Sequence, residues 1–164
     1  MADQLAVRGT LRDLIPIGGW VDDFAQRWSL PASTAFAIQL CCEEVFSNIV
    51  RHGLKERAAA AADEDGVHLY LDHGDRSVIL RIDDQAEAFD PLAVDSLLYP
   101  QSVAEASVGG LGIHLVRKFA QDVRYERRGQ TNSLTMRFDL PHAGASGSGS
   151  LAPRQYAKEE PALG

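Results

Sequence analysis

Two pairs of short alternating runs, each joined by a turn, constrain the fold of this chain most. Residues 67–71 and 78–82 alternate apolar with polar side chains on either side of the turn sequence HGDR, and residues 123–125 and 134–138 do so around Gly129. A period of two is typical of strands, and a short turn between two such runs indicates a β-hairpin. Strands that pair locally are antiparallel, which argues against a Rossmann-type parallel sheet.

Helical periodicity accounts for much of the remaining chain. It predicts an amphipathic helix over Leu14–Trp28, a longer helix from Ala32 to about Leu54, and a third that begins at or just after Gly112. A further strand is predicted over Leu5–Thr10. The order strand, two helices, hairpin, loop, helix, hairpin predicts an α+β two-layer sandwich, a mixed, mostly antiparallel sheet with helices on one face.

The chain divides into one domain and a tail. Its 164 residues, 45% of them hydrophobic, fit a single domain over residues 1–140. Residues 141–164 are rich in Gly, Ser, Ala and Pro with few large apolar side chains, which predicts a flexible tail. Residues 83–110 show no sustained periodicity, so we expect a mobile lid with one short helix there.

Charge and cysteine content narrow the possible partners and location. With a formal net charge of −7, the chain lacks the overall excess of positive charge that is typical of nucleic-acid-binding proteins. We therefore predict no direct contact with nucleic acid. No apolar run has the length of a membrane span, so we predict no membrane association. Cys41 and Cys42 are adjacent within a predicted helix, where their side chains point in different directions. We interpret them as core thiols of a protein in the reducing cytoplasm.

A carboxylate and a carboxamide are candidates for chemistry in the segment CEEVFSNIVRHG. Glu44 and Asn48 are four residues apart on a predicted helix, so both side chains lie over the same face. The amide oxygen suits Mg²⁺, while the carboxylate suits orienting or deprotonating a hydroxyl nucleophile. Taken alone, the pair also fits an ordinary solvated polar face.

Two more segments add candidate ligand contacts. In IDDQAEAFDP, at a predicted strand end, an aspartate can accept the exocyclic amino hydrogen of adenine, although Asp and Pro also favour plain turns. In GGLGIHLV, residues 109–116, glycines precede an apolar helical stripe, and the N–H groups of a helix start suit phosphate. The alternative is a glycine-rich loop without a ligand. The Walker pattern GxxxxGK[ST] is absent from the sequence.

The order and spacing of these three segments resemble the histidine-kinase-like ATPase fold, the Bergerat or GHKL superfamily, and within it the anti-sigma-factor serine/threonine kinase branch. The resemblance covers the chain from Glu43 to Phe138. It rests on Glu44-x-x-x-Asn48 with His52-Gly53 (the N box), Asp84 with Phe89-Asp90-Pro91 (the first glycine box), residues 109–116 (the second glycine box), and the continuation Asp122, Tyr125, Asn132 and Leu134.

The resemblance implies a Bergerat fold that binds ATP or ADP with Mg²⁺, and it implies a role for each matching residue. These roles are Asn48 as Mg²⁺ ligand, Glu44 as the residue that activates the attacking hydroxyl, Asp84 as the hydrogen-bond partner of adenine, Gly109, Gly110 and Gly112 as the phosphate cradle, and Asn132 as a weaker, water-mediated contact on the adenine side.

The resemblance also implies partners. Members of this branch bind a sigma factor to silence it, and they phosphorylate a serine or threonine on a small antagonist of the STAS fold, which completes a partner switch. It further implies a homodimer. A second hypothesis is a nucleotide-regulated protein that captures a partner without phosphorylating it. The ATP-binding half of a sensor histidine kinase is disfavoured, because the 43 residues before Glu44 contain no histidine to serve as phosphoacceptor.

Two features depart from the family pattern. The chain reads Asp84-Gln85-Ala86 where the first glycine box usually reads Asp-x-Gly. We expect the alanine to be tolerated if its backbone does not adopt a glycine-only conformation. The stretch Phe89–Leu111 also contains no Lys or Arg, although a transferring phosphoryl group normally gains from a placed cation. Arg51, Arg117 and Lys118 are the nearby candidates.

Overall fold

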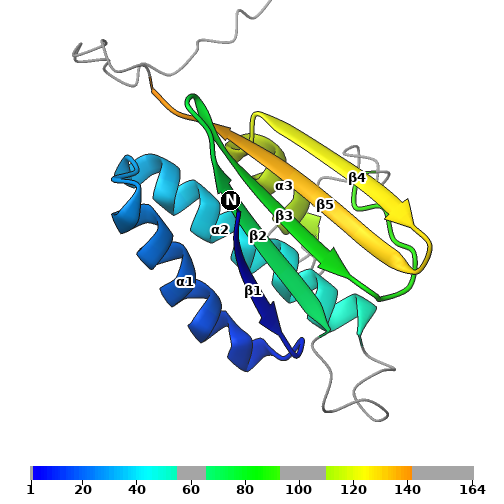
Figure 1. The fold of residues 1–164 in the computed structure, drawn as a ribbon. Helices are drawn as coiled ribbons and strands as arrows, with labels where there is room; N and C mark the ends of the chain where they lie inside the picture. The colour runs from blue at the N-terminus through cyan, green and yellow to red at the C-terminus, as the bar shows by residue number, and fades with distance from the viewer. Residues whose placement is uncertain (1, 55–65, 93–109, 142–164) are drawn as a thin grey trace, which may run out of the picture.

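The computed structural model describes residues 2–54, 66–92 and 110–141. These residues form a five-stranded sheet with α-helices on one face, so the predicted α+β two-layer sandwich is confirmed (Figure 1). The strands are β1 (Asp3–Val7), β2 (Val67–His73), β3 (Ser77–Asp84), β4 (Asp122–Arg128) and β5 (Thr131–Asp139). The helices are α1 (Leu14–Arg27), α2 (Ala32–Asn48) and α3 (Gly110–Phe119), with a 3-10 turn over Leu11–Asp13 and a π-helical turn over Ile49–Gly53.

The sheet has the strand order β1-β2-β3-β5-β4, and each of these neighbours is antiparallel. Both predicted hairpins are present, β2 with β3 and β4 with β5. The described strands contain no parallel pair, so the sheet is antiparallel where we expected a mixed one. The register places Asn132 of β5 between two partners, Asp84 of β3 on one side and Arg127 of β4 on the other.

The predicted bounds of the first strand and the predicted start of the third helix were wrong. The first strand ends at Val7, three residues before Thr10, because Gly9 takes a left-handed φ of +94° and the Asp13 carboxylate accepts the Thr10 N–H, which starts the helical turn. Helix α3 starts at Gly110, two residues before the expected Gly112. The low helix propensity of glycine costs little in the first turn of a helix, because the N–H groups of that turn have no intrahelical partner in any case. Residues 93–109 of the expected lid and 142–164 of the expected tail lie outside the described residues.

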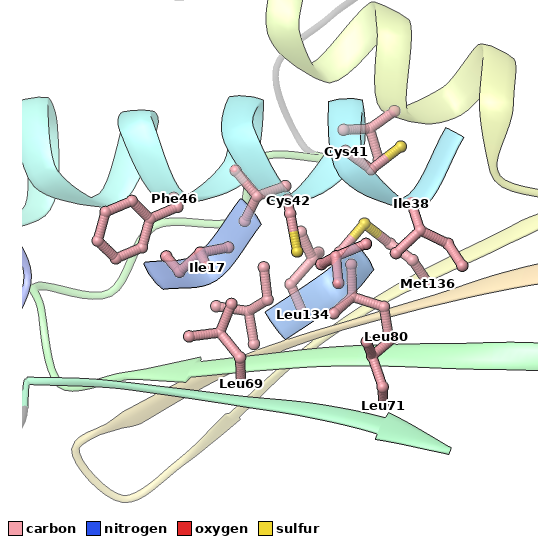
Figure 2. Packing of buried hydrophobic residues seen from close by; sticks show 14 of the residues in the cluster. Ile17, Ile38, Cys41, Cys42, Phe46, Leu69, Leu71, Leu80, Leu134 and Met136 are labelled. Carbon is pink, nitrogen blue, oxygen red and sulfur yellow. The ribbon is translucent and has the colours of Figure 1, made fainter. Parts of the chain in front are cut away.

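The core lies between the helices and the sheet. Phe46 and Cys42 extend from α2 toward the strands, and Leu69 and Leu80 extend back toward the helix (Figure 2). All four are fully buried, and each large apolar side chain removed from water in this way contributes about 1.5–3 kcal/mol before entropy costs. This packing fixes α2 across the sheet and so places its C-terminal half beside the ends of β3 and β5.

The two cysteines are free thiols of this core, as predicted. Their sulfur atoms point in different directions, that of Cys42 toward the sheet and that of Cys41 away from it (Figure 2). Burial, together with the nearby Glu44 carboxylate, raises the pKa of the Cys41 thiol to about 12. Burial also raises the pKa of Cys42. Both side chains are therefore protonated at neutral pH and pack as small apolar groups.

Candidate functional site

A cavity of about 490 Å³ opens where the C-terminal half of α2 and the start of α3 meet the ends of β3 and β5. Among the described residues its lining is mostly apolar, and its polar members include several residues singled out in the sequence. Among these are Asn48, Asp84 and Asn132, and the apolar walls include Ala86, Phe89 and Ile113. The volume and this mix of apolar walls with few polar groups are typical of a small-molecule site.

Asp84 is the last residue of β3 and forms one end of the cavity. It is only 6% exposed, and its Oδ1 accepts hydrogen bonds from the Ala86 backbone N–H at 2.8 Å and from Asn132 Nδ2 at 2.9 Å. Burial raises the pKa of the carboxyl group, while these hydrogen bonds and the charge of Arg127 oppose the rise. Within the described residues Oδ2 receives no hydrogen bond, so it is available to a donor on a ligand.

Asn132 lies beside Asp84 and uses both ends of its amide. Its Oδ1 accepts hydrogen bonds from the Tyr125 hydroxyl at 2.8 Å and from Arg127 Nη1 at 2.7 Å, and its Nδ2 also donates to the Glu87 carbonyl at 3.1 Å. These protein contacts fill the hydrogen-bonding capacity of the amide. The structure therefore shows Asn132 holding Asp84, and the water-mediated adenine contact expected from the sequence stays a prediction.

Arg127 is the site residue that the sequence analysis missed. Besides Asn132, its Nη1 donates to the Ala86 carbonyl at 2.8 Å, which ties β4 to the loop after β3. The signal was present in the strand alternation. Val123, Tyr125 and Arg127 occupy every second position of β4 and share the face that carries the core. A turn at Gly129 then places Arg127 opposite Asn132.

Beside the cavity, on the side that Asn48 lines, three predicted residues come together where α2 and α3 cross. A Cβ atom built on Gly112 of α3 would lie 2.6 Å from Glu44 Oε2 and 3.1 Å from Asn48 Nδ2. The start of α3 can approach α2 this closely because residue 112 has no side chain. Gly110 is the first residue of α3, and Gly109 lies outside the described residues.

The donor set at this crossing fits Mg²⁺ brought by a phosphorylated ligand. The described ranges contain no cluster of three or more His, Cys, Asp or Glu side chains that could hold a metal by themselves. Mg²⁺ is commonly bound by one or two protein oxygens and completes its shell with water and phosphate oxygens. Asn48 lines the cavity close to Glu44, and its amide carries an oxygen that fits this description.

Ala86, the departure from the family pattern, does not strain the chain. Among the described residues other than glycine, only Ser29 has a positive φ, so Ala86 is not in a glycine-only conformation, as expected. Its methyl group faces Gly53 of the π-helical turn, where an added Cβ would lie 2.6 Å from the Ala86 Cβ. Positions 53 and 86 therefore share room for one methyl group.

The three cations singled out in the sequence, Arg51, Arg117 and Lys118, do not line the Asp84 cavity. Arg117 Nη2 donates to the Leu92 carbonyl at 2.6 Å, and Arg117 lines a smaller, separate hollow. Arg51 and Lys118 are exposed, and no Lys or Arg lines the main cavity within the described residues. Within the described residues the cavity lining therefore has no cationic side chain; Arg127 lies beside it at Asn132, and the N–H groups at the start of α3 are a further source of positive potential.

Comparison with known proteins identifies the family. Residues 7–138 match the model described as the histidine kinase-like ATPase domain. The chain belongs to this family. Family membership implies that the chain binds ATP or ADP. A relative, the serine/threonine-protein kinase BtrW of Bordetella bronchiseptica, is 34% identical over 117 residues, which cover 71% of this chain and 79% of that protein.

Solved structures share the fold. A Mycobacterium tuberculosis structure of RsbU and RsbW domains matches with a TM-score of 0.60 at 13% identity, over 85% of this chain and 32% of that one, so this chain spans about a third of its length. The SiaB-SiaC complex of Pseudomonas aeruginosa matches with a TM-score of 0.52 at 13% identity, over 85% of this chain and 89% of that one. No helix in the described ranges combines the length and hydrophobicity needed to cross a bilayer.

Proposed function

We propose that this protein is an ATP- and Mg²⁺-dependent serine/threonine protein kinase that phosphorylates a STAS-type antagonist and also binds a sigma factor in a partner switch. The serine/threonine-protein kinase BtrW at 34% identity supports the activity. The RsbW domain and the SiaB-SiaC complex among structures of the same fold are consistent with a small protein partner. The sigma factor and a homodimer rest on the resemblance seen in the sequence, and a cytoplasmic location rests on the two free core cysteines.

The position of Glu44 carries this proposal. A site that only binds nucleotide uses Asp84, Asn48 and the glycines, but it has no use for a carboxylate at the start of α3. Glu44 Oε2 lies against Gly112, at the helix end where N–H groups favour phosphate. A substrate hydroxyl held there would attack the γ-phosphorus, the bond to the ADP oxygen would break, and Glu44 would take the proton.

The remaining residues would bind and orient the nucleotide. Asp84 Oδ2 would accept the exocyclic amino group of adenine, and the N–H groups of Gly109, Gly110 and Gly112 would face the phosphates. Asn48 would hold Mg²⁺, which when bound offsets the negative charge of the phosphates. Asp84 and Asn48 line the cavity and Gly112 lies against Glu44 and Asn48, which supports these assignments.

Transfer of labelled γ-phosphate from ATP to a purified STAS protein tests the proposal. We expect wild type to transfer phosphate and Glu44→Gln to lose about 100-fold or more in rate while still binding ADP. Glu43→Gln is the matched control, because Glu43 is exposed, accepts a hydrogen bond from Gln39 Nε2 and does not line the cavity. Equal rates in wild type and Glu44→Gln would contradict the role of Glu44.

A second candidate function is nucleotide-regulated capture of a partner without phosphotransfer. It is favoured by the absence of Lys and Arg from the described cavity lining, since phosphoryl transfer usually gains from a placed cation. The same assay separates the two functions. A wild-type protein that binds ADP and the STAS partner but transfers no phosphate would establish this second function.

A further inference from the structure

The hydrogen bonds around Asn132 decide which oxygen of Asp84 remains available. An amide can in principle be turned by 180°, which would bring Asn132 Oδ1, an acceptor, against the Asp84 carboxylate. Arg127 Nη1 opposes this orientation because it donates to Oδ1 and cannot accept a hydrogen bond, and the Tyr125 hydroxyl also donates to Oδ1. Asn132 Nδ2 therefore faces Asp84 Oδ1, and Oδ2 is left as an acceptor.

We propose that Arg127 and Tyr125 are positioning residues that set the base preference of the cavity by fixing the Asn132 amide and, through it, the Asp84 carboxyl group. This inference rests on the proposed function, in which the cavity holds the base of a nucleotide. A base with an amino group at Oδ2 is accepted. A base with a carbonyl oxygen there places two acceptors against each other and is rejected.

Burial makes this discrimination effective. Asp84 and Asn132 are each 6% exposed, so little water is available to satisfy a mispaired group. Sites built to hydrogen-bond one group reject an analogue without it far more strongly than apolar pockets reject a size change. Arg127 also donates to the Ala86 carbonyl, so the donor that orients Asn132 is itself anchored to the loop beside the cavity.

A purely structural role for Arg127 makes a different prediction. If Arg127 only ties β4 to the loop after β3, its loss weakens all nucleotides equally. If it orients Asn132, its loss changes the ratio of affinities for two bases.

The charge of Arg127 also lowers the pKa of Asp84, so its removal shifts the acid limb of binding to higher pH. Other titratable groups at this end are Asp83 on β3, Glu87 after it, Tyr125 on β4 and His52 in the π-helical turn.

The test compares ADP with inosine diphosphate, which has a carbonyl in place of the adenine amino group. Dissociation constants are measured by calorimetry with Mg²⁺ between pH 5.5 and 8 on the full chain. We expect wild type to prefer ADP by about tenfold or more, Arg127→Gln to reduce that preference by about fivefold or more, and Tyr125→Phe to reduce it less. Arg124→Gln is the control, because it removes the same charge from β4 at an exposed pair with Asp122.

The outcomes separate this inference from the proposed function. A wild-type protein that binds neither nucleotide, or binds both equally, overturns the base site and with it this inference. A wild-type preference for ADP that persists in both variants, or equal weakening of both nucleotides, overturns the inference alone. Tyr125→Phe removes one hydroxyl group, so it decides the matter if Arg127→Gln does not fold.

Discussion

The two ends of the cavity are built by different means. At the Asp84 end, proposed to bind the base, hydrogen bonds join side chains from neighbouring strands, and Asp84 and Asn132 are buried. At the phosphate end, Glu44 and Asn48 are only partly buried, and their side chains make no hydrogen bond within the described ranges; what brings them to α3 is the missing side chain of Gly112. Strand register thus arranges one end and close helix approach arranges the other.

The difference matches what each end is proposed to bind. A flat, neutral base is recognised through hydrogen bonds, which are directional. The protein group that binds it must therefore be oriented before the ligand arrives. Phosphates and Mg²⁺ bring strong charge of their own and need open space beside helix N–H groups. Variants that disturb one end should therefore leave a measurable signature that variants at the other end lack.

Gly112→Ala should have the largest effect and should act only at the phosphate end. The new methyl group would displace the Glu44 carboxylate, the far end of a flexible side chain. We expect phosphotransfer to fall about 100-fold while the free energy of unfolding changes by less than about 1 kcal/mol. Initial rates and urea unfolding measure the two quantities.

Gly19→Ala is the matched helical control for this substitution, because an added Cβ at Gly19 meets nothing within 4 Å. It should keep the full rate and gain up to about 1 kcal/mol of stability from helix propensity. A Gly112→Ala protein with an unchanged rate would show that the Glu44 carboxylate does not need its present position.

Asp84→Asn should act only at the base end. It replaces the free acceptor by a donor, so ADP affinity should fall roughly 10- to 100-fold, the loss of one hydrogen bond to a charged group. Calorimetry measures the affinity. Asp83→Asn is the control, because Asp83 is on the opposite face of β3 with Ser133 and Arg81. Undiminished ADP binding by Asp84→Asn would show that the base does not bind at this end of the cavity.

The same substitution should change how stability depends on pH. Burial raises the pKa of Asp84, so the folded protein binds a proton more tightly than the unfolded chain does. Wild-type stability should therefore fall as pH rises from the ordinary carboxyl pKa through the raised folded value. Asp84→Asn lacks this decline, and urea unfolding between pH 4 and 8 should show a flatter profile. Profiles of equal slope would contradict the burial effect.

Gly53→Ala should disturb one wall of the cavity, where Gly53 faces Ala86. Its Cβ would overlap the Ala86 methyl group, which is fixed to the backbone and cannot move aside. Overpacking of this kind costs about 1–3 kcal/mol, measured as a decrease in the free energy of unfolding. Adding Ala86→Gly should restore most of the loss. A double variant no more stable than Gly53→Ala would show that another contact is responsible.

Asn48→Ala should have the smallest effect and should sharpen the assignment of Mg²⁺. Calorimetry should show ADP affinity reduced by about tenfold or less with Mg²⁺ present and unchanged when the metal is chelated. Ser47→Ala, at the adjacent position of α2, controls for a general effect on the helix. Equal losses with and without Mg²⁺ would argue against Asn48 as a metal ligand.

Much of the fold could be predicted because its signals are local. The two hairpins follow from a period of two on either side of a turn, and α1 and α2 follow from periods of three and four. The boundaries that were wrong depend on contacts instead. Strand β1 ends early because Asp13 holds the Thr10 N–H, and α3 begins early at Gly110.

The candidate site was predictable to different degrees at its two ends. The motifs point to Asp84, Glu44 and Asn48, but a motif does not show which atoms meet. That Glu44 lies against Gly112 depends on how two helices pack. Arg127 could have been found from strand parity, whereas its two acceptors depend on the sheet register and on the course of the loop after β3.

The shared space between Gly53 and Ala86 also bears on how such sequences change over time. Either position tolerates a methyl group only while the other lacks one. A lineage that carries Ala86 avoids the overlap if it replaces Ala86 by glycine before position 53 gains a side chain. The reverse order passes through a strained intermediate. Substitutions at these two positions should therefore occur in a fixed order and vary together among descendants of this chain.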